Sequence, residues 1–435
     1  MGKTSDKGTS MNNGNVLNKS PLGLSVRLAG CLLWAVLLFS AGVLPVHGQT
    51  DLLLTPAEKS DRAPFSILMD IKKTPLNMVA VGERGHILFS DSECAGWTQA
   101  TSVPVSVTLT AVAFPSETKG WAVGHDGVVL HTEDGGKTWV KQLDGLKINE
   151  LIIGQLKQMI QDKKEALEKQ QSGSPEVQAG DEAAEAPEAP QEEPEVGDTA
   201  ETEEAENPLA LEIENLGYFL SDVELAVEEG PVWPLMDVWF KNDQEGIIIG
   251  AFGMILGTTD GGKTWNPMLD RIKNTDGLHL YAVTRSGDDL FIAGESGMLF
   301  RSEDFGNTWK QLESPYDGSY FGLVANPAGG FITAFGLRGN IYCSTDRGET
   351  WYPADTGAKA SISGGTFLSD GSFCIVCVDG SILISPDLGK TFKTLPARFP
   401  GAIAVAELRR GIITVAGLRG VTRIDLNNLS SDKKG

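Results

Sequence analysis

The stretch Thr132-Glu-Asp134-Gly-Gly136-Lys-Thr138-Trp139 is repeated along the chain. Each copy reads Ser/Thr-x-Asp-x-Gly-x-Thr and ends in Trp or Phe. Four further copies span residues 258–265, 302–309, 344–351 and 385–392, and a degenerate copy at 90–97 keeps only the first and last residues. A pattern written this often in one chain indicates a small structural unit that is used again and again.

The residue types of this repeat suit a tight β-hairpin, the Asp-box. The Asp carboxylate accepts hydrogen bonds from backbone N–H groups of its own turn, and the Gly supplies a left-handed residue. The final aromatic ring packs beneath the hairpin and buries a large apolar area. We therefore expect structural roles for Asp134, Trp139, Asp260, Trp265, Asp304, Trp309, Asp346, Trp351, Asp387 and Phe392.

A second element, Gly-x-x-Gly, precedes each box. It occurs at 82–85, 124–127, 250–253, 294–297 and 336–339, while 377–380 replaces the first Gly with Cys and 417–420 has no box after it. The second glycines, at positions 85, 127, 253, 297, 339, 380 and 420, are 42, 126, 44, 42, 41 and 40 residues apart. Seven units with a period near forty residues predict an all-β fold, a seven-bladed propeller of four-stranded antiparallel blades.

Each unit contains four strands, here called A to D from the centre outward. In blade 1 strand A is expected at 65–69, and in blade 2 the strands are expected at 109–114, 120–123, 128–132 and 139–143. The last blade offers only three, at 402–406, 412–416 and 421–424. We expect the apolar segment Asp51-Leu-Leu-Leu54 to supply its outer strand and close the ring, which removes an exposed sheet edge.

Charge and hydropathy divide the chain further. The formal net charge is −22, but residues 173–206 hold thirteen Asp/Glu and no Lys or Arg. The remainder is mildly acidic, which argues against a nucleic-acid partner. Lys3, Lys7, Lys19 and Arg27 precede an apolar run over 28–44, which predicts a signal peptide cleaved before Gln49 and a periplasmic location. An uncleaved inner-membrane anchor is the alternative.

Residues 144–230 interrupt the repeats. Apolar residues recur at helical spacing over 146–170 and again over 209–228, and the Pro/Glu/Ala-rich 173–206 between them is expected to be disordered. These two helices act either as a docking arm for a partner or as padding that pairs with itself. The expected domains are therefore 1–48 (signal peptide), 49–143 (blades 1 and 2), 144–230 (insertion), 231–426 (blades 3 to 7) and 427–435 (disordered tail).

Strand order places the Gly-x-x-Gly turns, which join strands B and C, on the same face as the connections between blades. The Asp-boxes join strands C and D and lie on the opposite rim. The first face carries the turn residues Arg84, Arg338, Arg419, His125 and Phe252. Three turn arginines form a basic spot for the carboxylates of a partner, or they are ordinary solvated turn residues.

Asp-boxes also occur in sialidases, so a glycoside hydrolase or a carbohydrate-binding propeller is the alternative function. Such enzymes need clustered arginines and a Tyr/Glu nucleophile pair. Arg62-Ala-Pro64 is only near to their N-terminal signature, and the histidines show no metal-ligand spacing. We expect no catalytic residue, no metal and no cofactor.

The cysteines at 94, 343, 374 and 377 are expected in the core, with a disulfide at Cys343 as an open alternative.

The run from Gly120 to Trp139 resembles the photosystem II stability/assembly factor family of Asp-box (BNR) propellers. The resemblance covers residues 60–142 and 232–425. It implies an exported, non-enzymatic, seven-bladed protein that holds a membrane protein during assembly through an arginine-rich surface. Arg84, Arg338 and Arg419 are the candidates for that surface. The helical insertion and acidic loop depart from the pattern. Similar bacterial proteins accompany exporters of the resistance-nodulation-division (RND) superfamily, which implies an RND-type exporter as the partner.

Overall fold

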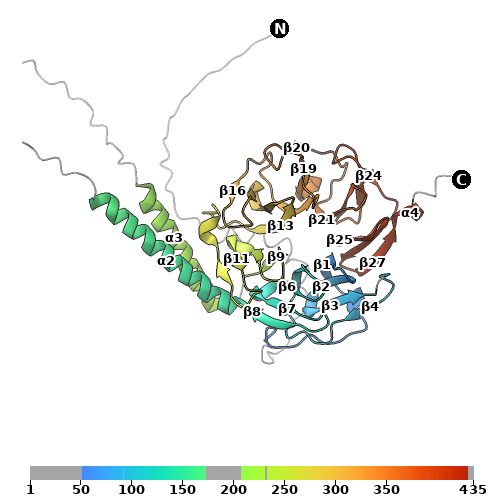
Figure 1. Ribbon diagram of the computed structural model, residues 1–435, viewed down its shortest axis with the longest axis horizontal. Helices are drawn as coiled ribbons and strands as arrows, with labels where there is room; N and C mark the ends of the chain where they lie inside the picture. Colours follow the sequence, from blue (N-terminus) through green and yellow to red (C-terminus); the bar gives the residue numbers. More distant parts are fainter. Residues whose placement is uncertain (1–50, 92, 173–206, 231–232, 430–435) are drawn as a thin grey trace, which may run out of the picture. The chain divides into compact units, whose positions relative to one another are not determined.

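The computed structural model describes residues 51–91, 93–172, 207–230 and 233–429. The expected signal peptide (1–48), the acidic loop (173–206) and the end of the expected tail (430–435) lie outside these residues. Within them the chain forms seven antiparallel sheets, six of four strands and one of three, each ordered as a meander. Figure 1 shows the successive blades in sequence colours. The predicted all-β, seven-bladed propeller is confirmed.

The strands alternate with tight turns because each blade repeats the same sequence pattern. Strands rich in Val, Ile and Ala follow one another with Gly, Asp and Asn between them. The strands are, for blade 1, β1 (Leu68–Lys73), β2 (Met78–Gly82), β3 (Ile87–Ser90) and β4 (Trp97–Gln99); for blade 2, β5 (Leu109–Ala113), β6 (Gly120–Gly124), β7 (Val129–Thr132) and β8 (Val140–Leu143); for blade 3, β9 (Leu235–Phe240), β10 (Gly246–Gly250), β11 (Ile255–Thr258) and β12 (Asn266–Pro267). They are, for blade 4, β13 (Leu280–Ser286), β14 (Asp289–Gly294), β15 (Leu299–Ser302) and β16 (Lys310–Gln311); for blade 5, β17 (Tyr320–Ala325), β18 (Ile332–Gly336), β19 (Ile341–Ser344) and β20 (Tyr352–Pro353). They are, for blade 6, β21 (Ile362–Phe367), β22 (Phe373–Cys377), β23 (Ile382–Ser385) and β24 (Lys393–Thr394); and for blade 7, β25 (Ala402–Arg409), β26 (Ile412–Gly417) and β27 (Gly420–Asp425).

The ring closes where blade 7 packs against blade 1. Strand β1 contacts both β25 and β26, and Leu68, Ile71 and Met78 share a buried cluster with Leu408 and Ile412. Arg409 adds an ion pair to Glu93, 2.6 Å between Nη1 and Oε1. Side-chain packing between the two blades therefore contributes to closure.

The expectation that Asp51–Leu54 supplies the outer strand of blade 7 is wrong. These residues form turns, and blade 7 has three strands among the described residues. Leu53 is buried in a cluster with Val79, Val81 and Val103, between blades 1 and 2. Its apolar side chain finds a core there, so nothing draws this segment to the other end of the chain.

Two boundaries also differ from expectation. Residues 63–65 form a 3-10 helix, η2 (Ala63–Phe65), so strand A of blade 1 begins at Leu68 and not at Phe65. At the other end, residues 426–429 form the short helix α4 (Leu426–Leu429), so residues 427–429 are helical and the expectation of disorder is wrong for them. The side chain of Asp425 accepts the Asn427 N–H at 3.0 Å, which stabilises the start of that turn.

The insertion forms two long helices, α2 (Gly145–Ser172) and α3 (Pro208–Glu229), which pack against each other. Asn207 caps α3 by accepting the Leu209 N–H at 2.9 Å, and Pro208 occupies the first turn. Lys157 pairs with Glu224 across the two helices. No helix among the described residues is long and apolar enough to cross a bilayer.

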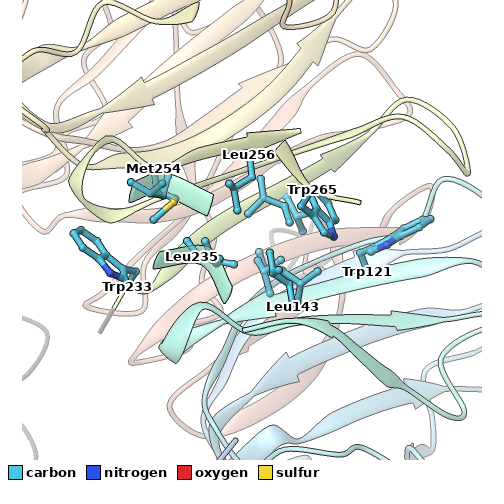
Figure 2. Close-up of a cluster of buried hydrophobic side chains, with 14 of the residues drawn as sticks. Trp121, Leu143, Trp233, Leu235, Met254, Leu256 and Trp265 are labelled. Atoms are coloured by element: carbon cyan, nitrogen blue, oxygen red, sulfur yellow. The ribbon is translucent and has the colours of Figure 1, made fainter. Parts of the chain in front are cut away.

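The helices are anchored in the cluster between blades 2 and 3. Ile148, Ile152 and Leu156 of α2 and Val223 of α3 are buried with the blade residues of that cluster. Figure 2 shows part of it, with Trp233, Leu235 and Met254 near one another and Leu143 facing Trp265. The Gln155 side chain adds hydrogen bonds to the carbonyl of Pro267 and to Asp270. The base of the arm is thus a continuation of the propeller core.

Candidate partner-binding face

In blades 1 to 5 the Gly-x-x-Gly turns join strand B to strand C in a one-turn 3-10 helix, and the turn at η8 (Leu337–Gly339) shows why both glycines are required. A Cβ on Gly336 would lie 2.1 Å from the Ser319 carbonyl oxygen, and a Cβ on Gly339 would lie 2.2 Å from that of Ala358. The turn is therefore wedged between its own strand A and the connection to the next blade. Both glycines serve close approach of backbone.

The central residue of each turn is the one that remains free to vary. Arg338 has φ +56° and an exposed side chain, and Arg84 has the same conformation in blade 1. A residue with a Cβ costs roughly 1–2 kcal/mol in this left-handed conformation. Positive φ also recurs in the Asp-box turns, so the conformation belongs to the turn and not to the arginine. The identity of the central residue sets the chemistry of the face.

Six exposed cations lie on this face over blades 5, 6, 7 and 1, and we call them the basic arc: Arg338, Lys359, Arg398, Arg419, Arg62 and Arg84. Arg338, Arg419 and Arg84 come from B–C turns. Lys359 and Arg398 lie in the connections between blades 5, 6 and 7, which emerge on the same side. Arg62 precedes η2, which contacts β27 of blade 7. None of the six forms an ion pair with another described residue.

Three carboxylates near the arc in sequence accept hydrogen bonds from backbone N–H groups, whereas Asp61, beside Arg62, is exposed. Glu83 accepts the Ile67 N–H at 3.1 Å, and Asp379 accepts the Ser381 N–H at 2.9 Å. Asp355 accepts the Gly357 N–H at 2.9 Å. Because the six cations form no ion pair with another described residue, they are available for a ligand with carboxylates, to which guanidinium groups bind with strong charge-assisted hydrogen bonds.

Three members of the arc, Arg62, Lys359 and Arg398, were missed by reasoning from the turns alone. The signal that identifies two of them is topological: in a four-stranded meander, the connection to the next blade leaves on the side of the B–C turn. A search of those connections for exposed cations finds Lys359 and Arg398 from sequence. Arg62 depends on where the segment before β1 lies, which no repeat pattern encodes.

His125 and Phe252 lie at the base of the arm, in the turns of blades 2 and 3. The turn η4 (His125–Gly127) contacts α2, and a Cβ on Gly127 would lie 2.6 Å from the Cα of Gly145. The Phe252 ring packs edge-on against Trp233 and against His279, with 4.9 Å between ring centroids in each case. His125 is exposed, whereas the half-buried Phe252 ring is already engaged. The five predicted binding residues therefore fall into two separate groups.

The Asp-box aspartates lie on the opposite rim and are engaged within their own turns. In each of the five full boxes one carboxylate oxygen accepts the N–H of the Thr four residues later, at 2.8–3.0 Å. In the degenerate box the neighbouring Asp91 takes this part, accepting N–H groups from Glu93, Ala95 and Gly96. Trp139 and Trp265 are buried beneath their hairpins, and Trp309, Trp351 and Phe392 are partly buried.

The central channel is lined by the innermost strands of all seven blades and has a volume of about 140 Å³. Ligand pockets for small molecules are commonly about 300–1,000 Å³. Lys72 is the one cation among the described lining residues, and these include no arginine. Asp70 and Asp237 each tie neighbouring blades together, through the N–H groups of Val112 and Val283. This lining lacks the arginine cluster that a sialidase needs, and Arg62 is not part of it.

The four cysteines of the described residues are buried and unpaired. Burial raises the pKa of Cys343 to about 11 and that of Cys374 and Cys377 to about 12. Thiols with such pKa values carry almost no thiolate near neutral pH, which disfavours metal or redox chemistry at these positions.

The turn geometry and the repeated boxes correspond to a known family. A family model described as "Photosynthesis system II assembly factor YCF48" matches residues 89–166 and 218–398, more than half of the chain. The chain belongs to this family. The photosystem II assembly lipoprotein Ycf48 of Synechococcus sp. (strain CC9902) is 26% identical over 171 residues, which are 39% of this chain and 50% of that protein.

Other relatives show a similar degree of identity. The chloroplastic photosystem II stability/assembly factor HCF136 of Arabidopsis thaliana is 26% identical over 140 residues, 30% of this chain and 34% of that protein. The chain thus spans half or less of the curated relatives that it matches. Two solved structures share the fold: a YCF48 bound to a D1 peptide (13% identity, TM-score 0.51) and the YCF48 of Cyanidioschyzon merolae (16% identity, TM-score 0.51). Each covers 82% of this chain, and the shares of those chains are 93% and 95%.

Proposed function

We propose that the protein is a non-enzymatic, exported scaffold that holds a membrane protein complex during its assembly or operation. The observation that carries the proposal is the basic arc, a set of exposed cations on the face opposite the Asp-boxes that form no ion pair with another described residue. Blades fixed by their turn glycines present these cations rigidly, so that little entropy is lost when a partner binds. Family membership supports the same function, since relatives are named as assembly or stability factors.

The partner segment is one that carries carboxylates, because Arg and Lys on a fixed surface recognise carboxylate groups. One relative has been solved with a D1 peptide, which supports peptide recognition as the mode of binding.

We further propose that the complex is an RND-type exporter and that the protein works in the periplasm. The support for these two points is the resemblance to bacterial propellers that accompany such exporters, together with the helical arm.

A charge-reversal experiment tests the arc. We expect Arg84→Glu, Arg338→Glu and Arg419→Glu together to abolish recovery of a membrane partner in a crosslinked, detergent-solubilised pull-down. The matched control is Lys137→Glu, Lys263→Glu and Lys390→Glu, three exposed cations of the Asp-box rim, which makes the same change in net charge. If the arc variant recovers the partner as well as the control does, the arc is not the binding surface.

A further inference from the structure

Helix α3 has two apolar sides, and only one of them is used. On one side Val223 is fully buried, and Leu216, Phe219 and Leu220 pack against the cluster at the base of the arm. On the other side Leu211, Tyr218 and Leu225 are 45%, 63% and 54% exposed. We call these three residues the outer stripe.

The spacing of the outer stripe is regular. Its members are seven residues apart, so they follow one line along the helix, about 21 Å long at 1.5 Å per residue. A seven-residue repeat is the spacing with which one helix packs along another. A surface helix of a soluble protein normally has a single apolar side, so a second one in line marks a contact surface.

The charges beside the stripe are all negative. Helix α3 contains six acidic residues and no Lys or Arg. Lysines of α2 neutralise two of them, since Lys163 pairs with Glu212 and Lys157 with Glu224. Glu214 and Asp222, which flank the outer stripe, are exposed, and neither forms an ion pair with another described residue. Glu214 accepts a hydrogen bond from the Tyr218 hydroxyl at 2.8 Å, which holds that ring along the helix.

We propose that the outer stripe binds an amphipathic helix of a partner protein, with apolar residues at seven-residue spacing and Lys or Arg beside them. The inference rests on the scaffold function proposed above and adds the chemistry of the partner at the arm. A partner of this kind covers the apolar stripe and neutralises Glu214 and Asp222 at once. The arm thereby recognises a basic helix, while the basic arc recognises an acidic segment.

The same charges decide against two other occupants. A second copy of α3 would bring Glu214 and Asp222 against identical carboxylates, and like charges in contact are unfavourable. A membrane surface carries anionic headgroups, and helices that lie in it present Lys and Arg on their polar side. Neither description fits an outer stripe flanked by carboxylates alone.

Fluorescence anisotropy tests the proposal on the full chain with two synthetic peptides of 21 residues. One is a helix with Leu at the contact positions and Lys beside them, and the other has Glu in place of each Lys. The test variant is Leu211→Gln, Tyr218→Gln and Leu225→Gln, which keeps every charge and uses a residue with good helix propensity. The matched control is Leu54→Gln, Leu76→Gln and Val140→Gln, three exposed apolar residues of the propeller.

We expect the natural chain and the control to bind the basic peptide at least tenfold more tightly than the test variant does, and to bind the acidic peptide weakly. Because the test variant keeps its net charge, general attraction between a basic peptide and an acidic chain is unchanged by it. Equal binding by the test variant overturns the inference. Two other results would also overturn the inference. If the natural chain sediments with vesicles of phosphatidylcholine and phosphatidylglycerol and the test variant does not, the occupant is a membrane surface. If light scattering shows dimers of the natural chain and of the control but not of the test variant, the occupant is a second copy.

Failure of this inference is distinguishable from failure of the proposed function. If the test variant still recovers the membrane partner in the crosslinked pull-down described above, and also binds the basic peptide as tightly as the natural chain does, the outer stripe is not a binding surface. The proposed scaffold function is then unaffected. If the natural chain binds the basic peptide but recovers no membrane protein, the result supports binding at the outer stripe and contradicts the proposed scaffold function.

Discussion

The aspartates of the Asp-boxes show how a charged side chain at a surface stabilises a turn. Asp134 accepts N–H groups from Lys137 and Thr138 and hydroxyl hydrogens from Thr132 and Thr138. These donors lie between Thr132 and Thr138, so a single carboxylate organises the whole hairpin. The same part is played by Asp91 in the degenerate box, one residue earlier in the pattern, which shows that the hydrogen bonds matter more than the position of the Asp.

Replacing Asp134 tests this view. We expect Asp134→Ala to lower the free energy of unfolding by roughly 1–3 kcal/mol, because several donors of the turn lose their acceptor. Urea denaturation followed by tryptophan fluorescence measures the change. Asp288→Ala is the control, since Asp288 is 91% exposed and its one ion pair among the described residues is with surface Arg285 at 3.4 Å. If both variants lose the same stability, the Asp-box carboxylate has no special role.

The contribution of the Asp237 carboxyl in the channel to stability changes with pH in the opposite direction from that of the Asp-box aspartates. Burial raises the pKa of Asp237 to about 6, and Lys72 opposes this only in part. Since the pKa is higher in the folded than in the unfolded chain, its contribution to stability is present at low pH and is lost as the pH rises through 6. For Asp260, the N–H of Thr264 lowers the pKa, so that contribution is lost on acidification.

We therefore expect the contribution of Asp237 to the free energy of unfolding to decrease by roughly 1–3 kcal/mol as the pH rises from the ordinary aspartate pKa of 3.8 to the folded-state pKa of about 6. In Asp237→Asn this part of the profile flattens, because the variant has no proton to lose there. Urea denaturation at a series of pH values measures both profiles. An unchanged slope in the variant would assign the pH dependence to another group.

At the scale of the element, α2 contains a polar residue that its surroundings do not satisfy. Asn149 is 2% exposed, and neither its Nδ2 nor its Oδ1 has a hydrogen-bond partner in the part of the chain that the structure describes. We expect Asn149→Leu to raise the free energy of unfolding by roughly 1–2 kcal/mol, because a buried amide without partners costs more than an apolar side chain of similar size. Thermal denaturation measures the difference. Asn215→Leu, on the exposed side of α3, is expected to change it little.

The two helices were predictable from sequence because their signal is local. Apolar residues at helical spacing predict a helix over 146–170, and α2 spans Gly145–Ser172. The seven blades were predictable for a similar reason, since paired glycines mark each place where a turn approaches other backbone. Which side of α3 stays exposed was not predictable, because both sides are apolar and only packing against the propeller decides between them.

Ring closure lies beyond local signals. Asp51–Leu54 has the composition of a strand, and the missing strand of blade 7 makes the pairing plausible. Burial of Leu53 between blades 1 and 2 is the alternative to this pairing, and it is the arrangement that the structure shows. The members of the basic arc that reasoning from the turns missed lie in connections, whose place depends on the whole topology. Sequence thus predicts the repeating unit well and its exceptions poorly, because the exceptions depend on contacts between distant parts of the chain.

At the scale of the whole molecule, the segment that leads into blade 1 seals the ring by lying against the first residue of β27. Gly420 has φ +85°, and a Cβ there would lie 1.9 Å from the carbonyl oxygen of Pro64 and 2.6 Å from the Cα of Phe65. The contact joins residues that are far apart in sequence, so it links the two ends of the propeller. A side chain at Gly420 must displace backbone, since no flexible group is available to move aside.

Gly420→Ala is therefore expected to lower the unfolding midpoint strongly, by the loss of roughly 2–4 kcal/mol, of which only about 1–2 kcal/mol comes from the left-handed conformation itself. Gly371→Ala isolates that smaller part, because Gly371 has φ +91° and no atom of another described residue lies within 4 Å of the added Cβ. Thermal denaturation of both variants measures the difference, and proteolysis near residue 62 reports whether the segment has detached. Equal midpoints would show that packing of β1 against β25 closes the ring without the segment at Pro64. A lower midpoint with early cleavage there would show that closure depends on both contacts.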